Sequence, residues 1–295
     1  GVVMKDFPLP VHVVGPGSQT EDDEQLQYLD MPRGMNTFQM PSIPERAEPT
    51  ALAGAHDLLE AYQVLLGDWN PANAARGPRL DLAGVGLPVL EVLNQVLGEG
   101  EVSIQVDGAR RYKIQESVFT GLWRVCALDG DGKLAHDWLE AGMVPEIAVR
   151  AARDAGRSAL APIDFPEGAM NSPALLAEIG SQLAARAAGD ASHVINLTLF
   201  PMTPQDHAVL EQALPVGPVA VISRGFGNCH VTSTGLADVW RVQYFNNMNT
   251  LILNTIEIVD VPEVVLAAVE DLTDSRERLA ELVDWMGESC VDATN

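Results

Sequence analysis

An internal duplication is the feature that most constrains how this chain can fold. Residues 101–149 align with residues 218–266 at a constant offset of 117 without a gap, and ten of the 49 aligned positions are identical. Self-similarity at one fixed offset indicates a repeated structural unit, so the same module is predicted to occur twice. The identical positions include Trp123-Arg124-Val125 on Trp240-Arg241-Val242, Val144-Pro145-Glu146 on Val261-Pro262-Glu263, and Glu140 on Glu257.

The first copy of the module shows a defined order of periodic segments. Apolar residues at helical spacing predict a helix over Thr50–Leu66, a short strand follows around Asp81, and a second helix begins at Pro88. Four strands separated by turn sequences such as Asp107-Gly108 then predict an antiparallel meander, and Pro145 opens a helix over residues 146–155. The predicted strands are Val102–Val106, Tyr112–Ser117, Leu122–Leu128 and Leu134–Glu140.

The second copy repeats this order. A short strand is predicted through Ile195, Leu197 and Leu199, and a helix is predicted to start at Pro262 and to continue towards Trp285. The region from Glu257 onwards is strongly acidic, which predicts a negatively charged C-terminal helix. The strands predicted between these segments are Val219–Ser223, Cys229–Thr234, Val239–Phe245 and Thr250–Ile258.

These patterns predict an α+β fold made of two tandem homologous units, each an antiparallel sheet with helices on one face. A duplicated unit often packs on its copy about a pseudo-twofold axis, but the sequence leaves open how the copies meet. The predicted domains are an extended, proline-rich acidic arm (1–50), a first α+β repeat (51–155), a linker (156–172) and a second α+β repeat with the acidic C-terminal helix (173–295).

Charge and cysteine content restrict the classes of function. The formal net charge is -23, from 41 acidic and 18 basic residues. Such a surface repels nucleic acid and anionic lipid and attracts cationic peptides, although a charge excess more often only keeps a protein soluble. No apolar run predicts a membrane span, and a secretory signal pattern is not seen. Three dispersed cysteines without a C-x-x-C motif fit reduced thiols in a cytoplasmic protein.

The sequence contains no recognisable catalytic constellation. The Gly225-Phe226-Gly227 turn could approach a phosphate, but a strand and not a helix follows it, so a hairpin turn is the favoured interpretation. Cys229 and His230 are neighbours on a predicted strand, and their side chains therefore point to opposite faces. The histidines show no metal-ligand spacing. We therefore expect a protein that is not an enzyme and that has neither a cofactor nor a metal site.

Polar residues that are peculiar to the second copy are the candidates for partner recognition. Asparagines replace charged residues and glycines of the first copy, and Tyr244-Phe245 replace Ala127-Leu128. Amides beside aromatic rings on strands suit recognition of a peptide, while the more conservative interpretation is that the asparagines serve turns and the rings fill the core. The candidate partner-binding residues are Arg224, Asn228, His230, Tyr244, Asn246 and Asn254.

Longer motifs resemble a known family. GFGNCH followed by VWRVQYFNNMNTLILNTIEIVDVPEV is similar to the conserved C-terminal region of the HupH/HyaF family of hydrogenase expression proteins, and GPGSQ followed by YLDMPRGMNTF resembles the family's N-terminal part. The resemblance implies a maturation chaperone for a [NiFe] hydrogenase. Such a protein would bind the iron–sulfur small-subunit precursor, with its twin-arginine leader, before export. It implies no catalytic residues. It allows other maturation proteins as further partners, and it also allows a homodimer.

Two alternatives remain open at this level. An iron–sulfur cluster assembly or protection factor would use Cys229 and His230 as ligands, and stoichiometric iron in anaerobically purified protein would support it. A hydrolase or transferase would use the turn at residues 225–227, and it requires a pocket where an acid, a base and a nucleophile converge.

Overall fold

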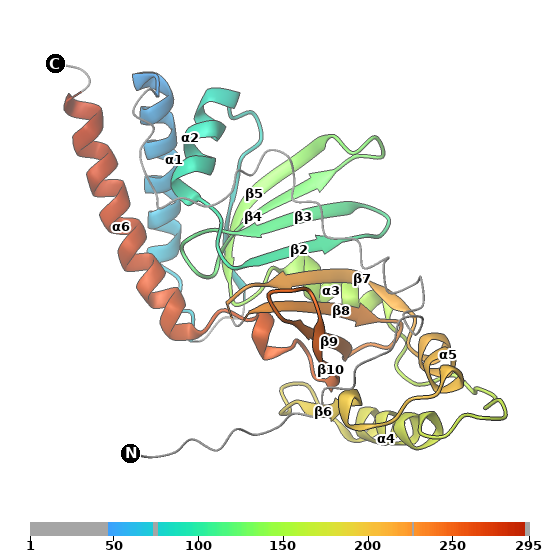
Figure 1. The fold of residues 1–295 in the computed structure, drawn as a ribbon. Coiled ribbons are helices and arrows are strands. Elements are labelled where there is room, and N and C mark those ends of the chain that lie inside the picture. Colours follow the sequence, from blue (N-terminus) through green and yellow to red (C-terminus); the bar gives the residue numbers. More distant parts are fainter. Residues whose placement is uncertain (1–46, 73–75, 226, 293–295) are drawn as a thin grey trace, which may run out of the picture. The chain divides into compact units, whose positions relative to one another are not determined.

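The computed structural model describes residues 47–72, 76–225 and 227–292. Nearly all of the predicted N-terminal arm, and Phe226 of the Gly225-Phe226-Gly227 turn, therefore lie outside the described residues. The strands of the described part form one ten-stranded sheet in which neighbouring strands are antiparallel (Figure 1). No helix in these ranges is long and apolar enough to cross a membrane.

The elements of the first repeat follow the predicted order. The strand boundaries agree with the sequence pattern to within two residues, and the helix after Pro145 has the predicted bounds. The elements are α1 (Pro49–Gly67), β1 (Arg76–Asp81), α2 (Leu87–Leu97), β2 (Val102–Val106), β3 (Arg111–Glu116), β4 (Leu122–Leu128), β5 (Leu134–Gly142) and α3 (Glu146–Ala155).

The second repeat departs from prediction at two places. The stretch through Leu197 and Leu199 is a 3-10 turn after a shorter strand, and Pro262 precedes a second 3-10 turn, so the last helix begins only at Val269. The elements are α4 (Ser172–Ala185), β6 (His193–Asn196), η2 (Leu197–Leu199), α5 (Pro204–Ala213), β7 (Val216–Ser223), β8 (Asn228–Thr234), β9 (Val239–Phe245), β10 (Leu251–Ile258), η3 (Glu263–Val265) and α6 (Val269–Asp292).

The repeats join through their equivalent strands β2 and β7. Ile104 lies opposite Val221, its own counterpart at the offset of 117, and the strands run antiparallel. The strand order is β1-β5-β4-β3-β2-β7-β8-β9-β10-β6, so each strand of the first repeat has its counterpart at the same distance from the centre. This arrangement is a pseudo-twofold axis through the β2–β7 pair, equivalent to a twofold dimer fused into one chain.

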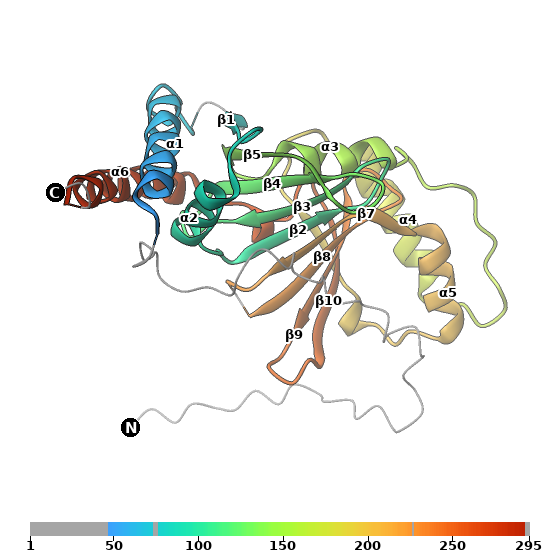
Figure 2. The ribbon, with the colours of Figure 1, turned by 90° about the horizontal axis from the view of Figure 1, so that it is seen from above.

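Helix pairs cover the two ends of one sheet face, here called the helix-pair face. Helices α1 and α2 pack on Leu122, Leu139 and Ala141 in one core cluster, while α4 and α5 pack on Val239 and Ile256 in another. Figures 1 and 2 show the two groups of helices at opposite ends of the described body. The antiparallel α+β class with two tandem units is thereby confirmed.

The opposite face, here called the α3 face, carries the central core. Side chains alternate between faces along each strand, so Val125, Val221 and Val242 point away from the helix pairs. They form one cluster with Ile147 and Ala148 of α3 and with the segment after β10. Prediction placed all helices on one face, and α3 is the exception because its apolar residues cover the junction between the repeats.

The tryptophan of the Trp-Arg pair that occurs in both copies has a structural role in the sheet. Trp123 is buried on the α3 face, and its Nε1 donates to the carbonyl of Gly142 at 3.0 Å. Trp240 is also buried, and its Nε1 donates to the carbonyls of Val259 and Asp260 at 3.2 Å. In each repeat the indole therefore ties the start of the fourth strand to the end of the fifth strand or to the residues directly after it.

The acidic helix α6 returns to the first repeat. Its buried residues Leu279, Val283 and Met286 belong to the cluster of α1 and α2, and Figure 1 shows α6 beside α1. Arg276 donates from Nη1 to the carbonyl of Leu66 at 3.3 Å and to that of Trp69 at 2.6 Å. These bonds satisfy backbone carbonyls at the C-terminal end of α1. The end of the second copy thus stabilises the first.

Candidate functional site

Three of the six candidate residues lie on the helix-pair face of the second repeat. Asn228, His230 and Asn254 are each half-buried, and register places His230 and Asn254 in one row on either side of Gln243. The ring of His230 lies 4.8 Å from that of Phe245, and burial lowers the pKa of His230. Asn254 accepts a hydrogen bond from Nε of Arg241 at 3.4 Å. This row keeps amide and imidazole groups partly open to a partner.

Tyr244 lies on the other face, so it does not join this row. It stands directly opposite Cys229 on the neighbouring strand. Burial raises the pKa of Cys229 to about 11 and that of Tyr244 to about 12. Cys229 is fully buried and remains protonated at neutral pH, which makes it a poor nucleophile and a poor metal ligand.

The last two candidates lie in turns at the same end of the sheet. Arg224 follows β7, is exposed, and its backbone N–H donates to the carbonyl of Glu101 at 3.0 Å. Asn246 follows β9, and its Oδ1 accepts from the backbone N–H groups of Met248 and Thr250 at 2.9 Å. Asn246 therefore holds the β9–β10 turn in shape, as asparagine does in many turns.

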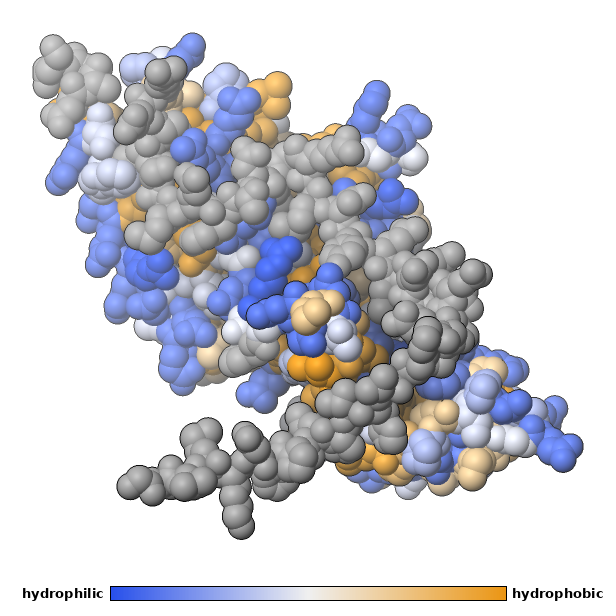
Figure 3. Space-filling view, in the orientation of Figure 1, coloured by the Kyte–Doolittle hydropathy of each residue, from blue (hydrophilic) through white to orange (hydrophobic). Residues whose placement is uncertain are grey.

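The β9–β10 turn presents apolar side chains that sequence reasoning missed. Met248, Leu251 and Ile252, here called the apolar tip, are 84%, 41% and 57% exposed. Figure 3 shows hydrophobic surface in the lower centre of the view, where β9 and β10 lie in Figure 1. Leu199 at the end of η2 and Phe200 directly after it are also exposed, and η2 packs beside β10. Contiguous exposed apolar groups rimmed by polar ones are typical of a protein-binding surface.

The equivalent hairpin of the first repeat has the same turn but keeps only one of the three apolar residues of the tip, because Leu134, the counterpart of Leu251, is 50% exposed. Oδ1 of Asp129 accepts from the backbone N–H groups of Asp131 and Lys133 at 2.9 Å, as Asn246 does in the second repeat. At the positions of Met248 and Ile252, however, the first repeat carries exposed Asp131 and Ala135. Since the backbone bonds are the same, the difference lies in what the side chains offer to a partner.

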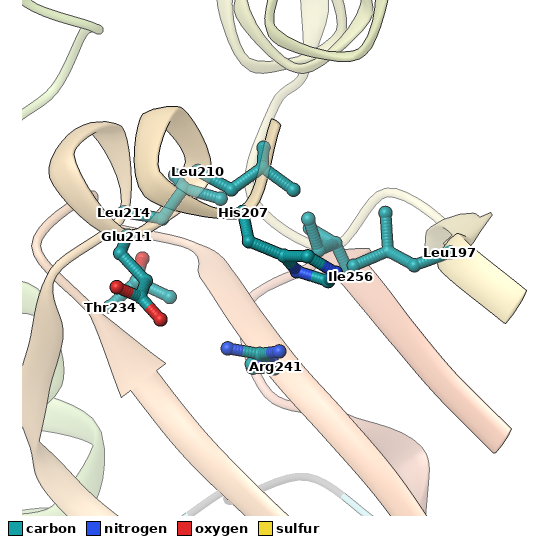
Figure 4. A pocket seen from close by; sticks show the side chains of 8 residues that line it. All are labelled: Leu197, His207, Leu210, Glu211, Leu214, Thr234, Arg241 and Ile256. Atoms are coloured by element: carbon teal, nitrogen blue, oxygen red, sulfur yellow. The ribbon is translucent and has the colours of Figure 1, made fainter. Parts of the chain in front are cut away.

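A small pocket lies between α5 and the helix-pair face of the sheet (Figure 4). Its volume of about 40 Å³ has room for a few water molecules, far below the several hundred Å³ of a small-molecule site. In Figure 4 the side chains of Arg241 and Glu211 extend towards the same space from the sheet and from α5. The lining residues are Leu197, His207, Leu210, Glu211, Leu214, Thr234, Arg241 and Ile256.

The arginine of the repeated Trp-Arg motif has different surroundings in the two copies. Arg124 is buried and donates to Asp137 of β5 and to Asn94 of α2. In the second repeat Asn254 stands at the position of Asp137, and Glu211 stands at the position of Asn94. The carboxylate is therefore on helix α5 and not on strand β10. Arg241 and Asn254 are both half-buried. The first copy therefore holds a closed structural cluster, and the second leaves polar groups accessible.

Potential metal ligands are sparse among the described residues. His56, Asp57 and Glu60 at the surface of α1 form the one grouping of possible ligands in these ranges, and such exposed groupings are common without a metal. Cys126 and Cys290 are half-buried, and neither forms a disulfide. His230 lies on the face opposite Cys229, so the adjacent pair does not converge on one site.

Comparison with known proteins identifies the family. The profile of the C-terminal conserved region of HupH hydrogenase expression protein matches residues 52–163 and, a second time, residues 169–286. The chain belongs to the HupH family. The two matches coincide with the two halves of the sheet, so the family's conserved region is the duplicated module itself.

Curated HupH-family relatives match along nearly the whole chain. Hydrogenase expression/formation protein HoxQ of Cupriavidus necator is 44% identical over 285 residues, covering 96% of this chain and 99% of HoxQ. HupH of Rhodobacter capsulatus is 40% identical over 287 residues, covering 96% and 99%. Hydrogenase-1 operon protein HyaF of Escherichia coli is 33% identical over 285 residues, covering 94% and 97%.

A solved structure, the hydrogenase expression protein HupH from Thiobacillus denitrificans, also matches this chain. It is 29% identical, and the alignment covers 40% of this chain and 96% of that one, with a TM-score of 0.35.

Proposed function

We propose that this protein is a non-enzymatic maturation chaperone of a [NiFe] hydrogenase. It binds the iron–sulfur small-subunit precursor, with its twin-arginine leader, in the cytoplasm before export. Family membership supports the hydrogenase part of the proposal, because the relatives are named hydrogenase expression/formation proteins. The apolar tip supports the binding part, since three exposed apolar residues at one hairpin, against Leu134 as the one large exposed apolar residue at its duplicate, indicate a surface retained for a partner.

The charge of the protein fits a basic partner segment. A net charge of -23 attracts a segment that carries arginines and increases the rate of encounter. Binding then combines long-range attraction with burial of the apolar tip. We expect the candidate residues Asn228, His230 and Asn254 to contribute hydrogen bonds around the tip, as polar groups do at the rim of an interface.

The geometry gives less support to the alternative functions. Cys229, the thiol that a cluster-assembly factor would use, is fully buried and protonated, and His230 points to the other face of the sheet. A hydrolase or transferase would need a pocket with converging groups, but the pocket beside α5 (about 40 Å³) and a second one between α4 and β6 (about 110 Å³) are both much smaller than a substrate site. We therefore carry the chaperone proposal forward.

An exchange of side chains between the two hairpins tests the proposal. The variant Met248→Asp with Ile252→Ala gives the second hairpin the residues of the first, and Asp131→Met with Ala135→Ile is the matched control. Binding to small-subunit precursors with and without the leader is measured at low salt. All four positions are exposed, so both variants should keep the wild-type melting temperature.

We expect the first variant to bind the precursor at least tenfold more weakly and the control to bind like wild type. The proposal fails if neither precursor binds the wild-type protein, or if the first variant binds as tightly as wild type.

A further inference from the structure

The first repeat contains a complete arginine-binding arrangement at the edge of the α3 face. Glu140 of β5 and Glu146 at the start of α3 hold two arginines of the edge strand β1. Arg79 lies 3.3 Å from Glu140 and donates to Glu146 at 2.8 Å, and Arg76 forms an ion pair with Glu146. The guanidinium of Arg79 also lies 5.3 Å from the ring centre of Trp138. Two carboxylates and two guanidinium groups thus balance one another.

The second repeat keeps both carboxylates and has neither arginine. Glu257 and Glu263 are the duplicates of Glu140 and Glu146. On the edge strand, Val194 pairs with Glu257 in the register in which Arg79 pairs with Glu140. Among residues 47–72, 76–225 and 227–292, no ion pair involves Glu257 or Glu263.

The backbone turn that carries the second carboxylate is the same in both copies. The N–H of Ala148 donates to the carbonyl of Pro145 at 3.1 Å, and the N–H of Val265 donates to that of Pro262 at 3.0 Å. Pro145 and Pro262 also share the same extended conformation, with φ of -61° and -57°. The turn that carries Glu146 is therefore reproduced at Glu263, although α3 continues and η3 does not.

Without a cation nearby, the ionised form of Glu257 beside Glu263 is electrostatically disfavoured. Glu257 is half-buried, and burial followed by the charge of Glu263 raises the pKa of Glu257. A nearby cation would remove this penalty, because an opposite charge favours the ionised form of a partly desolvated carboxylate. Val194 is 49% exposed, so the position that Arg79 fills in the first repeat is covered here only by a short apolar side chain.

We propose that Glu257 and Glu263 form a receptor for a pair of arginine side chains supplied by the partner protein. The incoming guanidinium groups replace Arg79 and Arg76 and lie over Val194 at the open edge of β6. This inference rests on the proposed function, and it names the chemistry by which the basic part of the partner is recognised. Arginine is favoured over lysine, because a planar guanidinium can bridge two carboxylates with paired hydrogen bonds.

The edge strand gives the partner segment a defined position. β6 pairs with β10 on one side, and no backbone hydrogen bond from its other side to the rest of the described chain is found. An extended segment can add along this edge and direct its side chains over Val194 towards Glu257. Leu199, Phe200 and the apolar tip lie on the elements next to β6, so apolar residues of the same partner have a surface to follow.

A substitution that supplies the missing arginine from within the chain tests the receptor. Val194→Arg is expected to pair with Glu257 and Glu263 as Arg79 pairs with their counterparts, and so to occupy the site. Binding of a blocked Arg-Arg dipeptide is measured by calorimetry at low salt, with a blocked Lys-Lys dipeptide as the matched probe. The proteins compared are wild type, Val194→Arg, Val194→Thr and Glu257→Gln with Glu263→Gln.

We expect wild type and Val194→Thr to bind the arginine probe alike and the other two variants to bind it at least tenfold more weakly. Val194→Arg should also melt at or above the wild-type temperature, which separates a filled site from a misfolded one. The receptor is refuted if wild type does not bind the probe, if it binds the lysine probe equally well, or if Val194→Arg binds like wild type. Since no precursor is used, these outcomes stand apart from failure of the proposed function.

Discussion

The buried cluster around Arg124 should contribute strongly to stability, whereas its counterpart around Arg241 should not. Asp137→Asn gives the first repeat the residue that the second carries at Asn254. Arg124 and Asp137 are 8% and 4% exposed, so the substitution leaves a buried guanidinium without its carboxylate. Breaking a buried pair costs about 3–5 kcal/mol. Because Asn94 still accepts a bond from Arg124, we expect the lower value, about 3 kcal/mol.

Urea unfolding followed by tryptophan fluorescence measures this free energy. With a urea dependence of about 3 kcal/mol/M, the midpoint should fall by about 1 M. Asn254→Asp is the matched control. It places a carboxylate beside half-buried Arg241 and should change stability by less than about 1 kcal/mol. A loss below about 1 kcal/mol for Asp137→Asn, or equal effects of the two variants, would refute the distinction between a structural first copy and an accessible second copy.

Two further variants test individual buried acids. Burial raises the pKa of Glu116 to about 7 from its ordinary value of 4.5, so the folded state binds a proton that the unfolded state releases between these values. The free energy of unfolding should therefore fall by about 3 kcal/mol as pH rises through this window. In Glu116→Gln the side-chain amide oxygen can still accept a hydrogen bond from the backbone N–H of Gly121, and this pH dependence of stability should disappear. Urea midpoints measured at pH 5 and pH 8 test the prediction. A fall between the two pH values that is as large in the variant as in wild type would contradict the assignment of this proton to Glu116.

Asp206 of α5 is the second of these acids, and it joins α5 to the start of α4 by accepting bonds from Ser172, Asn171 and Thr203. Burial alone raises its pKa, but these bonds outweigh burial and hold the pKa below its ordinary value. Its stabilisation is therefore present above about pH 4 and is lost as pH falls further. Asp206→Ala should cost about 3 kcal/mol and speed amide exchange in α4, whereas unchanged exchange there would count against this role.

Much of the fold was predictable because local signals were strong. Alternating apolar residues between Asp-Gly turns located the strands from Val102 to Gly142, and Pro145 located the start of α3. The wrongly placed strand in the second repeat came from assuming one offset throughout. Strand pairing places Ile195 opposite Ile256 as it places Leu80 opposite Leu139, so β1 and β6 correspond at a different offset from the rest. Leu197 and Leu199 were therefore assigned to a strand although they form a turn.

The junction of the repeats and the candidate site were less predictable. Pairing of β2 with β7 depends on contacts between distant parts of the chain, and the residues of a strand do not specify which strand lies beside it. The polar positions of the second copy drew attention to the β9–β10 hairpin but not to its apolar tip. A comparison of Asp131 with Met248, and of Ala135 with Ile252, would have revealed the tip from sequence alone.

The asymmetry of the two hairpins is the central claim, and amide hydrogen exchange on the complex tests it most directly. The protein is incubated with the small-subunit precursor, and exchange is compared with that of the free protein along both hairpins. We predict protection of β6 and the β9–β10 hairpin and none in the β4–β5 hairpin. Equal protection of both hairpins, or protection confined to β4–β5, would contradict a binding surface that belongs to the second copy.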